Sequence, residues 1–395
     1  MKISFGILLM ISALLMACGS SKPVAESTLD VTKTMNVAKA HLENSLREHT
    51  DKTLFPRSTK SDGSLNAVPA RDWTSGFYPG SLWYMYDYTK DKRWADSAAA
   101  WTAGLESEKL NTHTHDLGFI LYCSFGNGLR LTGDADYQAI LLQGAKSLSS
   151  RFNPKTGVIR SWDHGKWQFP VIIDNMMNLE FLFWATKVSG DSSFYKIAVT
   201  HANTTMKNHF RMDNSSYHVV DYDTTTGKVL SRVTHQGYAD ESAWARGQAW
   251  GLYGYTVMYR ETQDKKYLDQ AVKIAAFMLD HPNLPKDKVP YWDYNDPAIP
   301  TTQRDASAAA IMASALLELS QYVKAKNNYF ESAKRILKSL GSKNYLAKPG
   351  ANQNFFLMHS VGHKPAKSEI DVPIIYADYY YLEALLRYDR MSQKK

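Results

Sequence analysis

Apolar residues recur at helical spacing along almost the whole chain, and longer polar segments interrupt them. Runs of this kind bury one face of a helix against a core, so they predict amphipathic helices. The periodic runs cover 33–48, 76–88, 91–107, 117–132, 135–151, 174–189, 191–208, 242–262, 265–280, 304–323, 326–341 and 372–391. The pattern therefore predicts twelve helices.

Five of these helices open on the same short pattern, an Asp or Asn followed three residues later by an aromatic residue. The side-chain oxygen of Asp or Asn accepts a backbone N–H that the first helical turn leaves unpaired. The five instances are Asp91…Trp94, Asp134…Tyr137, Asp191…Phe194, Asp264…Tyr267 and Asn327…Phe330. Each follows the preceding helical run after only a few residues, which predicts antiparallel helical hairpins.

Long polar segments rich in aromatic residues precede every second helix. They span 49–73, 108–115, 152–173, 209–241, 282–303 and 342–371. Loops of this length in a compact domain usually carry function. If six hairpins close into a ring, all these segments meet at one end. We therefore predict an all-α (α/α)6 barrel, a double ring of helices with a pocket at one mouth. An open superhelix is the alternative, but the more hydrophobic second helices favour the closed ring.

The N-terminus reads as a targeting segment. Lys2 precedes an apolar stretch over 7–16 that is too short to span a bilayer. Leu15-Met16-Ala17-Cys18 then resembles a bacterial lipobox, in which Cys18 is lipidated and becomes the mature N-terminus. An ordinary signal peptide is the alternative.

These patterns give a domain plan and a location. We expect a signal peptide over 1–17, a flexible tether over 18–30 and a single catalytic barrel over 31–391. We also expect a periplasmic or outer-membrane-anchored lipoprotein of a Gram-negative bacterium, held to the membrane only by its lipid. Cys123 is then the remaining free thiol, so neither an intramolecular disulfide nor a cysteine-based zinc site can form.

Composition fits a globular protein and points to a lined cavity. The 395 residues are 44% hydrophobic and 22% charged, which excludes wholesale disorder. Aromatic residues make up 12%, with ten Trp and 24 Tyr. Such a surplus of aromatic residues suits either a groove whose rings stack on carbohydrate or an aromatic-rich core. The net charge of +7 permits an anionic partner without requiring one.

Two carboxylates at the starts of second helices are the first candidates for chemistry. Asp174 follows the apolar run Val171-Ile172-Ile173, so we expect it to be buried. If Asp116 lies at the same pocket mouth, burial and mutual repulsion separate the pKa values of the two carboxyl groups. One aspartate is then protonated and the other ionised, as general-acid catalysis needs. Two ordinary helix caps are the alternative, and this is the interpretation we adopt for Asp305 and Asp371.

The sequence lacks the motifs that mark other kinds of functional site. His113-x-His115-Asp116 contains metal-binding residue types, but no second cluster accompanies it, so we predict no metal site. The chain has no phosphate-binding loop, no dinucleotide-binding glycine motif in its proper context and no nucleophile elbow. Its charges are scattered rather than gathered in a basic stripe, which argues against nucleic acid. We predict no cofactor.

The chain resembles the unsaturated glucuronyl hydrolases, glycoside hydrolase family 88. The segments that carry the resemblance are 115–119, 172–179, 217–222, 236–250, 304–309 and 359–365. The block 236–250 (QGYADESAWARGQAW) is the longest and most specific of them. The resemblance implies an (α/α)6 barrel. It also implies removal of a 4,5-unsaturated uronic acid from the non-reducing end of lyase-generated glycosaminoglycan oligosaccharides, by hydration of the vinyl ether.

The resemblance also implies roles for individual residues. Asp174 matches the general acid/base, and Asp116 matches the second aspartate that stabilises positive charge. The positions that match those holding the unsaturated uronate are His218, Gln236, Arg246 and Trp250. We expect Arg246 to face the carboxylate and Trp250 to stack on the sugar. We further expect Trp73 and Trp162 to line the pocket.

The segment before the last helix is the candidate for the next sugar. We propose that Ser360, His363 and Lys364 contact that sugar or its sulfate. Two other functions remain open at this point. One is the sister activity on unsaturated galacturonyl-rhamnose from pectin, and the other is a lipoprotein that binds glycans without cleaving them. A binder has no need of paired aspartates.

Overall fold

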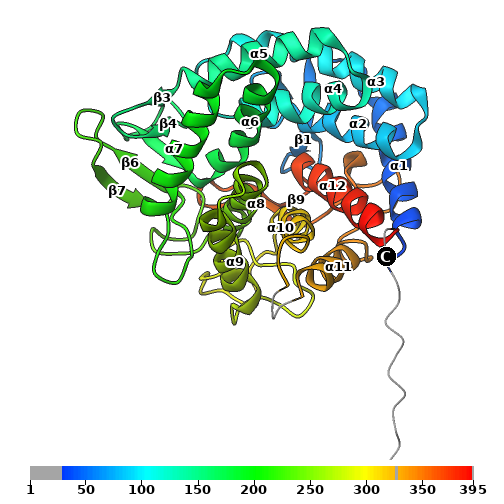
Figure 1. Cartoon of the computed structure of the whole chain (residues 1–395). Helices are drawn as coiled ribbons and strands as arrows, with labels where there is room; N and C mark the ends of the chain where they lie inside the picture. Colours follow the sequence, from blue (N-terminus) through cyan, green and yellow to red (C-terminus); the bar gives the residue numbers. More distant parts are fainter. Residues whose placement is uncertain (1–28, 325–327, 394–395) are drawn as a thin grey trace, which may run out of the picture.

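The computed structural model describes residues 29–324 and 328–393 and contains all twelve predicted helices (Figure 1). The outer helices are α1 (Val31–Glu48), α3 (Lys92–Ala103), α5 (Ala135–Ser149), α7 (Ser192–Asn208), α9 (Lys265–Asp280) and α11 (Tyr329–Leu340). The inner ones are α2 (Phe77–Thr89), the π-helix η2 (Gly118–Gly126) with α4 (Asn127–Thr132), the 3₁₀ helix η3 (Ile173–Asn178) with α6 (Leu179–Ser189), α8 (Ala245–Thr262), α10 (Ala306–Leu319) and α12 (Ile375–Ser392).

The inner helices form a closed ring. Each packs on the next, from α2 through η2, η3, α8 and α10 to α12, and α12 packs back on α2. All of α10 is buried, as is most of α8, because these helices meet neighbours on every side. The closed barrel is therefore confirmed over the open superhelix.

The predicted capping pattern holds for four outer helices. In each, the Asp side chain accepts the backbone N–H two residues further along, at 2.8–3.1 Å. The four caps are Asp91, Asp134, Asp191 and Asp264. At α11 the cap is Asn328, which accepts the N–H of Glu331, whereas the predicted Asn327 lies outside the described residues.

The long segments hold short antiparallel strands that the helical pattern did not predict. The strands are β1 (Leu54–Thr59), β2 (Leu65–Pro69), β3 (Phe152–Asn153), β4 (Val158–Ile159), β5 (Pro170–Ile172), β6 (Val219–Tyr222), β7 (Val229–Val233), β8 (Ser360–His363) and β9 (Ser368–Val372). They pair as β1-β2, β3-β4, β5-β6-β7 and β8-β9. The chain remains a helical barrel, but its loop end is stiffened by backbone hydrogen bonds.

The two aspartates predicted to be caps behave differently. Asp305 caps α10, because its Oδ1 accepts the N–H groups of Ser307 and Ala308. Asp371 does not cap α12, which begins four residues later. It lies in β9 in a left-handed conformation (φ 57°) and its carboxylate is 2.7 Å from Nδ1 of His359. The cap prediction for Asp371 is therefore wrong, because the strand pairing continues to Val372.

Candidate active site

A cavity of about 320 Å³ opens at the end of the barrel where the inner helices begin. It is lined by Arg57, Trp73, His113, Thr114, His115, Asp116, Trp162, His164, Ile172, Asp174, His235, Gln236, Arg246, Gly362, His363, Glu369 and Tyr376. These residues precede or open five of the inner helices. The segment 282–303 before α10 supplies none of the lining residues, so five of the six long segments, rather than all six, meet at the cavity.

Asp174 is the second residue of η3 and is buried, with an exposed fraction of 7%. The pKa of its carboxyl is raised to about 7, chiefly because burial disfavours the charged form. The positive charge of Arg246 lowers this pKa, and the negative charge of Asp116 raises it. Its Oδ2 accepts no hydrogen bond from any residue in the described ranges. At neutral pH a large fraction of Asp174 therefore carries its proton, as an acid catalyst needs.

Asp116 lies in a more polar environment on the same cavity. Thr114 Oγ1 donates a 2.7 Å hydrogen bond to Asp116 Oδ2, and His115 Nε2 lies 3.2 Å from Asp116 Oδ1. Its side chain keeps 17% of its surface exposed. The two carboxylates thus share one cavity in unlike surroundings, which is the arrangement that the sequence predicted.

The missing side chain of Gly118 brings these two segments together. A Cβ at Gly118 would overlap Oδ1 of Asn178, the last residue of η3. Only glycine allows the start of η2 to approach η3 this closely. Asp116 precedes η2 by two residues and Asp174 belongs to η3, so this contact helps place both carboxylates on one cavity.

His218 has its tautomer set by the backbone. Its Nδ1 accepts the N–H groups of both His235 (3.1 Å) and Gln236 (3.0 Å), so this nitrogen carries no proton. Burial, with nearby histidines and Arg246, lowers its pKa well below the ordinary value. The neutral ring therefore holds its proton on Nε2, which lies 3.8 Å from Oδ2 of Asp174.

Arg246 ties the β8-β9 hairpin to α8. Its Nη atoms donate to the carbonyls of Val361 and Gly362, and Nη1 lies 3.3 Å from Oδ2 of Asp305. Gln236 Nε2 donates to the same Gly362 carbonyl at 3.1 Å. Asp305 therefore acts twice, as the cap of α10 and as the partner of a buried guanidinium.

Of the three predicted tryptophans, two line the cavity and one does not. Trp73 and Trp162 are lining residues. Trp250 is fully buried, with its ring 5.2 Å from that of Phe119 and 5.4 Å from that of Tyr380. The prediction that Trp250 stacks on sugar is therefore wrong, because no face of the ring is exposed. Its indole N–H instead helps to lower the pKa of Asp174.

The cavity also contains an ion pair that the sequence did not predict. Arg57, on β1, donates two 2.8 Å hydrogen bonds to the carboxylate of Glu369, on β9. Arg57 also donates to Asp72 at 2.8 Å. No periodic pattern or motif marks these residues, since the pair joins positions 312 apart in the chain.

Only one of the three residues proposed for the next sugar reaches the cavity. His363 lines it and bonds to the His235 carbonyl at 2.8 Å, whereas Ser360 is fully buried. Lys364 Nζ donates to Asp296 (3.1 Å) and Thr302 (2.7 Å) and lies over the ring of Trp292. These contacts direct Lys364 away from the cavity, which corrects its proposed contact with a sulfate.

We accordingly expect Lys364→Ala to lower kcat/KM by the same factor, about twofold to fivefold, on sulfated and unsulfated disaccharides. The variant loosens the hairpin that supplies Gly362 and His363 without removing a substrate contact. Steady-state kinetics on a matched pair of substrates measures the ratio. A loss confined to the sulfated disaccharide would show that Lys364 contacts the sulfate directly.

In residues 29–324 and 328–393, no three or more His, Cys, Asp or Glu side chains are grouped as metal ligands. Over the same ranges, none of the helices has the length and apolar character that crossing a membrane requires.

Comparisons with known proteins agree with this geometry. The family model described as Glycosyl Hydrolase Family 88 matches residues 47–393. An unsaturated glucuronyl hydrolase of Formosa agariphila is 51% identical over 86% of each chain. An unsaturated chondroitin disaccharide hydrolase of Streptococcus pneumoniae is 33% identical, over 85% of this chain and 86% of its own. The crystal structure of an unsaturated glucuronyl hydrolase specific for heparin superposes with a TM-score of 0.90 at 54% identity, over 92% of this chain and 98% of that one.

Proposed function

The chain belongs to glycosyl hydrolase family 88, and from that premise we propose that it removes the 4,5-unsaturated uronic acid from lyase-generated glycosaminoglycan oligosaccharides. The observation that carries this proposal is the pair of carboxylates on one cavity, with Asp174 buried and its pKa raised to about 7. A protein that only binds glycans has no use for a protonated acid beside a second carboxylate.

The reaction begins with proton transfer to the substrate. The Asp174 carboxyl protonates C4 of the C4=C5 double bond, and the positive charge develops at C5 and the ring oxygen. The Asp116 carboxylate stabilises this charge electrostatically. Water then attacks C5 and gives a proton to the Asp174 carboxylate, which restores the acid.

Hydration makes the glycosidic bond labile. The product of water addition is a hemiketal at C5, whose ring opens to a C5 ketone. The former ring oxygen remains on C1 as a hydroxyl, so C1 becomes a hemiacetal. This hemiacetal collapses to an aldehyde and releases the neighbouring sugar with its hydroxyl. Atoms and protons balance with one water consumed.

The remaining residues hold the uronate. His218 is buried and is not one of the lining residues, but its fixed Nε2–H lies 3.8 Å from Oδ2 of Asp174; Gln236 and Arg246 line the cavity and supply further N–H groups. Trp73 and Trp162 add aromatic rings to the cavity wall. The binding pocket therefore combines directional donors with flat apolar walls, as sugar sites do.

We further propose that the preferred substrates are heparin-type fragments. The relative described as specific for heparin is 54% identical to this chain, whereas the chondroitin disaccharide hydrolase is 33% identical. Identity at this higher level favours a shared substrate class.

One assay tests the activity and the substrate class together. Loss of the double bond's ultraviolet absorbance is followed on lyase products of heparin, chondroitin, hyaluronan and pectin. We expect the fastest loss on heparin products. Activity confined to pectin products would favour the galacturonyl-rhamnose hydrolase, and no loss on any product would favour the glycan binder.

The pH profile provides a further prediction. Since Asp174 must be protonated to attack the double bond and its pKa is about 7, kcat/KM is expected to fall tenfold per pH unit well above pH 7. Initial rates at subsaturating substrate from pH 5 to pH 9 measure this limb. A rate that stays flat to pH 9 would assign the proton donor to another group.

The location remains a proposal from the sequence. We propose that Cys18 is lipidated and that the barrel lies in the periplasm or on the outer membrane of a Gram-negative cell; residues 1–28 lie outside the described ranges. Cys18→Ala is expected to release the protein from the membrane fraction, with mass spectrometry of the N-terminus as the direct check.

A further inference from the structure

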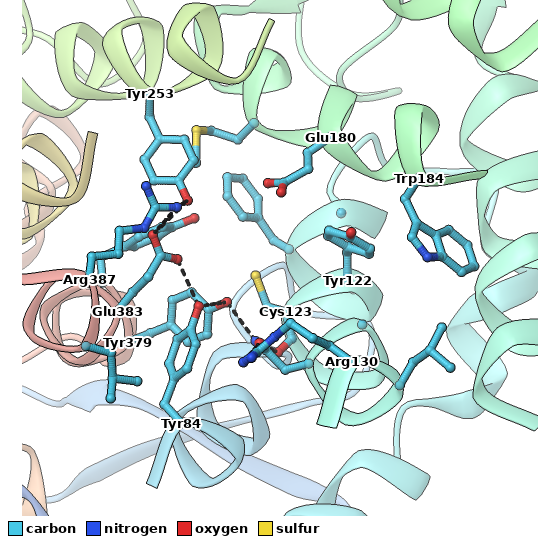
Figure 2. A pocket seen from close by; sticks show the side chains of 18 of the residues that line it. Tyr84, Tyr122, Cys123, Arg130, Glu180, Trp184, Tyr253, Tyr379, Glu383 and Arg387 are labelled. Carbon is cyan, nitrogen blue, oxygen red and sulfur yellow. Dashed lines mark hydrogen bonds and ion pairs between the residues drawn. The ribbon is translucent and has the colours of Figure 1, made fainter. Parts of the chain in front are cut away.

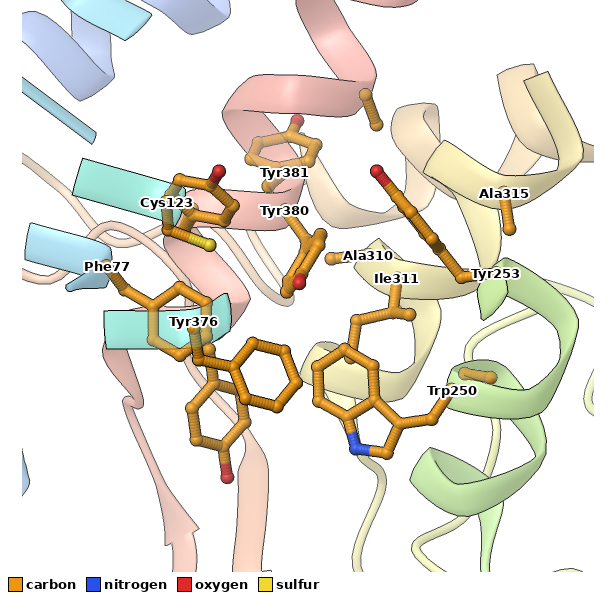
Figure 3. Close-up of a cluster of buried hydrophobic side chains, with 14 of the residues drawn as sticks. Phe77, Cys123, Trp250, Tyr253, Ala310, Ile311, Ala315, Tyr376, Tyr380 and Tyr381 are labelled. Carbon is orange, nitrogen blue, oxygen red and sulfur yellow. The ribbon is translucent and has the colours of Figure 1, made fainter. Parts of the chain in front are cut away.

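The catalytic cavity is closed at its inner end by a layer of aromatic rings (Figure 3). Tyr376 lines the cavity, and its ring lies 6.0 Å from that of Phe77. Trp250 continues the layer, in contact with Phe119 and Tyr380. These five side chains are buried and close-packed, so a ligand in the catalytic cavity cannot extend into the barrel interior.

A separate cavity of about 480 Å³ lies beyond this layer (Figure 2). Its lining residues include Tyr84 of α2 and Trp184 of α6, and it shares none with the catalytic cavity. Phe119 and Tyr380 line it from the other side of the ring layer. The catalytic cavity itself, at about 320 Å³, is at the small end of ligand pockets. A longer oligosaccharide must therefore leave it outwards, across the rim.

An open groove of about 690 Å³ borders this rim, and His113 lines both the groove and the catalytic cavity. Thr114 and Trp162 line the cavity and pair with each other in an antiparallel bridge. Arg160 lies two residues before Trp162 and lines the groove, so its Cα is at most about 7 Å from that of a cavity residue. A sugar chain that leaves the cavity on this side passes into the groove.

Two guanidinium groups share one carboxylate in the groove. Arg151 binds both oxygens of Asp163, with Nη1 and Nη2 at 3.2 and 3.0 Å, and donates to the carbonyls of Thr112 and Arg160. Nη1 of Arg160 lies 3.4 Å from the same carboxylate. Asp163 is the only carboxylate among the described residues that line the groove. The two arginines therefore leave an excess of one positive charge, which favours an anionic ligand.

Arg160 has hydrogen-bond donors to offer such a ligand. Its Nε is buried and has no hydrogen-bond partner in residues 29–324 and 328–393, and 32% of its side-chain surface is exposed. The guanidinium lies over the ring of the buried Phe169, with its Cζ 5.8 Å from the ring centroid. An oxyanion at the exposed end of Arg160 would accept charge-assisted hydrogen bonds without displacing the Arg151–Asp163 pair.

We propose that this groove binds the carboxylate of the third sugar of the substrate, with Arg160 as its partner. The proposal rests on the proposed function, in which the unsaturated uronate lies at Asp174. Uronic acid alternates with an amino sugar in glycosaminoglycans, so the first and third sugars of a lyase-generated oligosaccharide are both uronates. The protein therefore prefers tetrasaccharides and longer fragments to disaccharides.

A pair of substrates of different length tests the proposal. The probes are the unsaturated disaccharide and tetrasaccharide of unsulfated, N-acetylated heparin-type chains, which differ in charge only by the third-sugar carboxylate. We expect kcat/KM to be about fivefold higher on the tetrasaccharide. Arg160→Gln should remove this advantage and keep kcat/KM on the disaccharide within about twofold.

Two further variants control for charge and for fold. Arg160→Lys keeps the positive charge and should retain part of the tetrasaccharide advantage, so a loss in Arg160→Gln alone reports the charge rather than a damaged fold. Arg93→Gln removes an arginine of α3 whose side chain is 83% exposed. It is the matched control and should leave kcat/KM on both substrates unchanged.

Calorimetric titration of Asp174→Asn separates binding from chemistry. We expect this variant to bind the tetrasaccharide about fivefold more tightly than the disaccharide, and the added Arg160→Gln substitution to equalise the two affinities. Equal affinities, with both substrates hydrolysed by the unmodified protein, would overturn the groove and leave the proposed function intact. The fivefold difference without any hydrolysis would support the groove and overturn the proposed function.

A sulfated disaccharide distinguishes the two sources of an anionic group. If the N-sulfated disaccharide binds more tightly than the N-acetylated one and Arg160→Gln removes the difference, the groove takes a sulfate of the second sugar. That outcome would overturn the assignment to the third-sugar carboxylate. We expect instead that Arg160→Gln changes the affinities of the two disaccharides by the same small factor.

Discussion

Replacing Asp174 by Asn is expected to lower kcat/KM on an unsaturated disaccharide by about a thousandfold. The amide fits the same buried position but cannot transfer a proton to C4 or recover one from water. Ultraviolet assay of the double bond under subsaturating substrate measures the loss. Retention of more than about a tenth of the activity would assign the acid role to another group.

Thermal stability separates this chemical loss from a loss of fold. The folded-state pKa of Asp174 is about 7 and its ordinary value is 3.8, so the free energy of unfolding falls as pH rises from about 4 to about 7. Above pH 7 the buried charge costs about 4 kcal/mol. An amide avoids that cost, so Asp174→Asn is expected to raise Tm at pH 8 and to change it little at pH 4. A lower Tm at pH 8 would mean that the variant has lost structure.

Replacing Asp116 by Asn is expected to lower kcat/KM by about a hundredfold and to move the basic limb of the pH profile. The negative charge of Asp116 raises the pKa of Asp174, so its removal lowers that pKa. The fall in activity should therefore begin at a lower pH than in the unmodified protein. Rates from pH 5 to pH 9 measure both effects.

Asp371→Asn is the matched control for this experiment. Asp371 lies on the hairpin that borders the cavity, and its side chain is 49% exposed. Its replacement is expected to leave both the rate and the limb nearly unchanged. If the basic limb of the pH profile of kcat/KM stays in place or moves to higher pH in Asp116→Asn, the two aspartates are not coupled through their charges.

Local pattern was enough to predict the helices. Twelve periodic apolar runs became the helices of the barrel, and Asp91, Asp134, Asp191 and Asp264 cap their helices as predicted. A helix closes its hydrogen bonds within four residues, so its evidence lies in a short stretch of sequence. The strand β5 was missed because it pairs with β6 nearly fifty residues later, and these two strands are only three and four residues long.

The site was predicted in part. Motif and context were sufficient to place Asp116 and Asp174 on one cavity, because each follows a long segment and lies at the start of an inner helix. They were insufficient for Trp250, Ser360 and Lys364, whose environments are set by other segments. Trp250 is enclosed by Phe119 and Tyr380, and Lys364 is held by Asp296 and Thr302. Nothing next to these residues in the sequence indicates those contacts.

The sequence by itself determined the helical barrel, the end of the barrel at which the cavity lies and the position of the two aspartates at that end. It did so because periodicity, capping and motif are local properties. The tertiary structure decided which side chains face the cavity and in which protonation state. The raised pKa of Asp174 comes from burial by the surrounding elements and from the charges of Arg246 and Asp116. The tautomer of His218 comes from backbone groups at positions 235 and 236. Both properties depend on groups distant in the chain that only folding brings within a few ångströms.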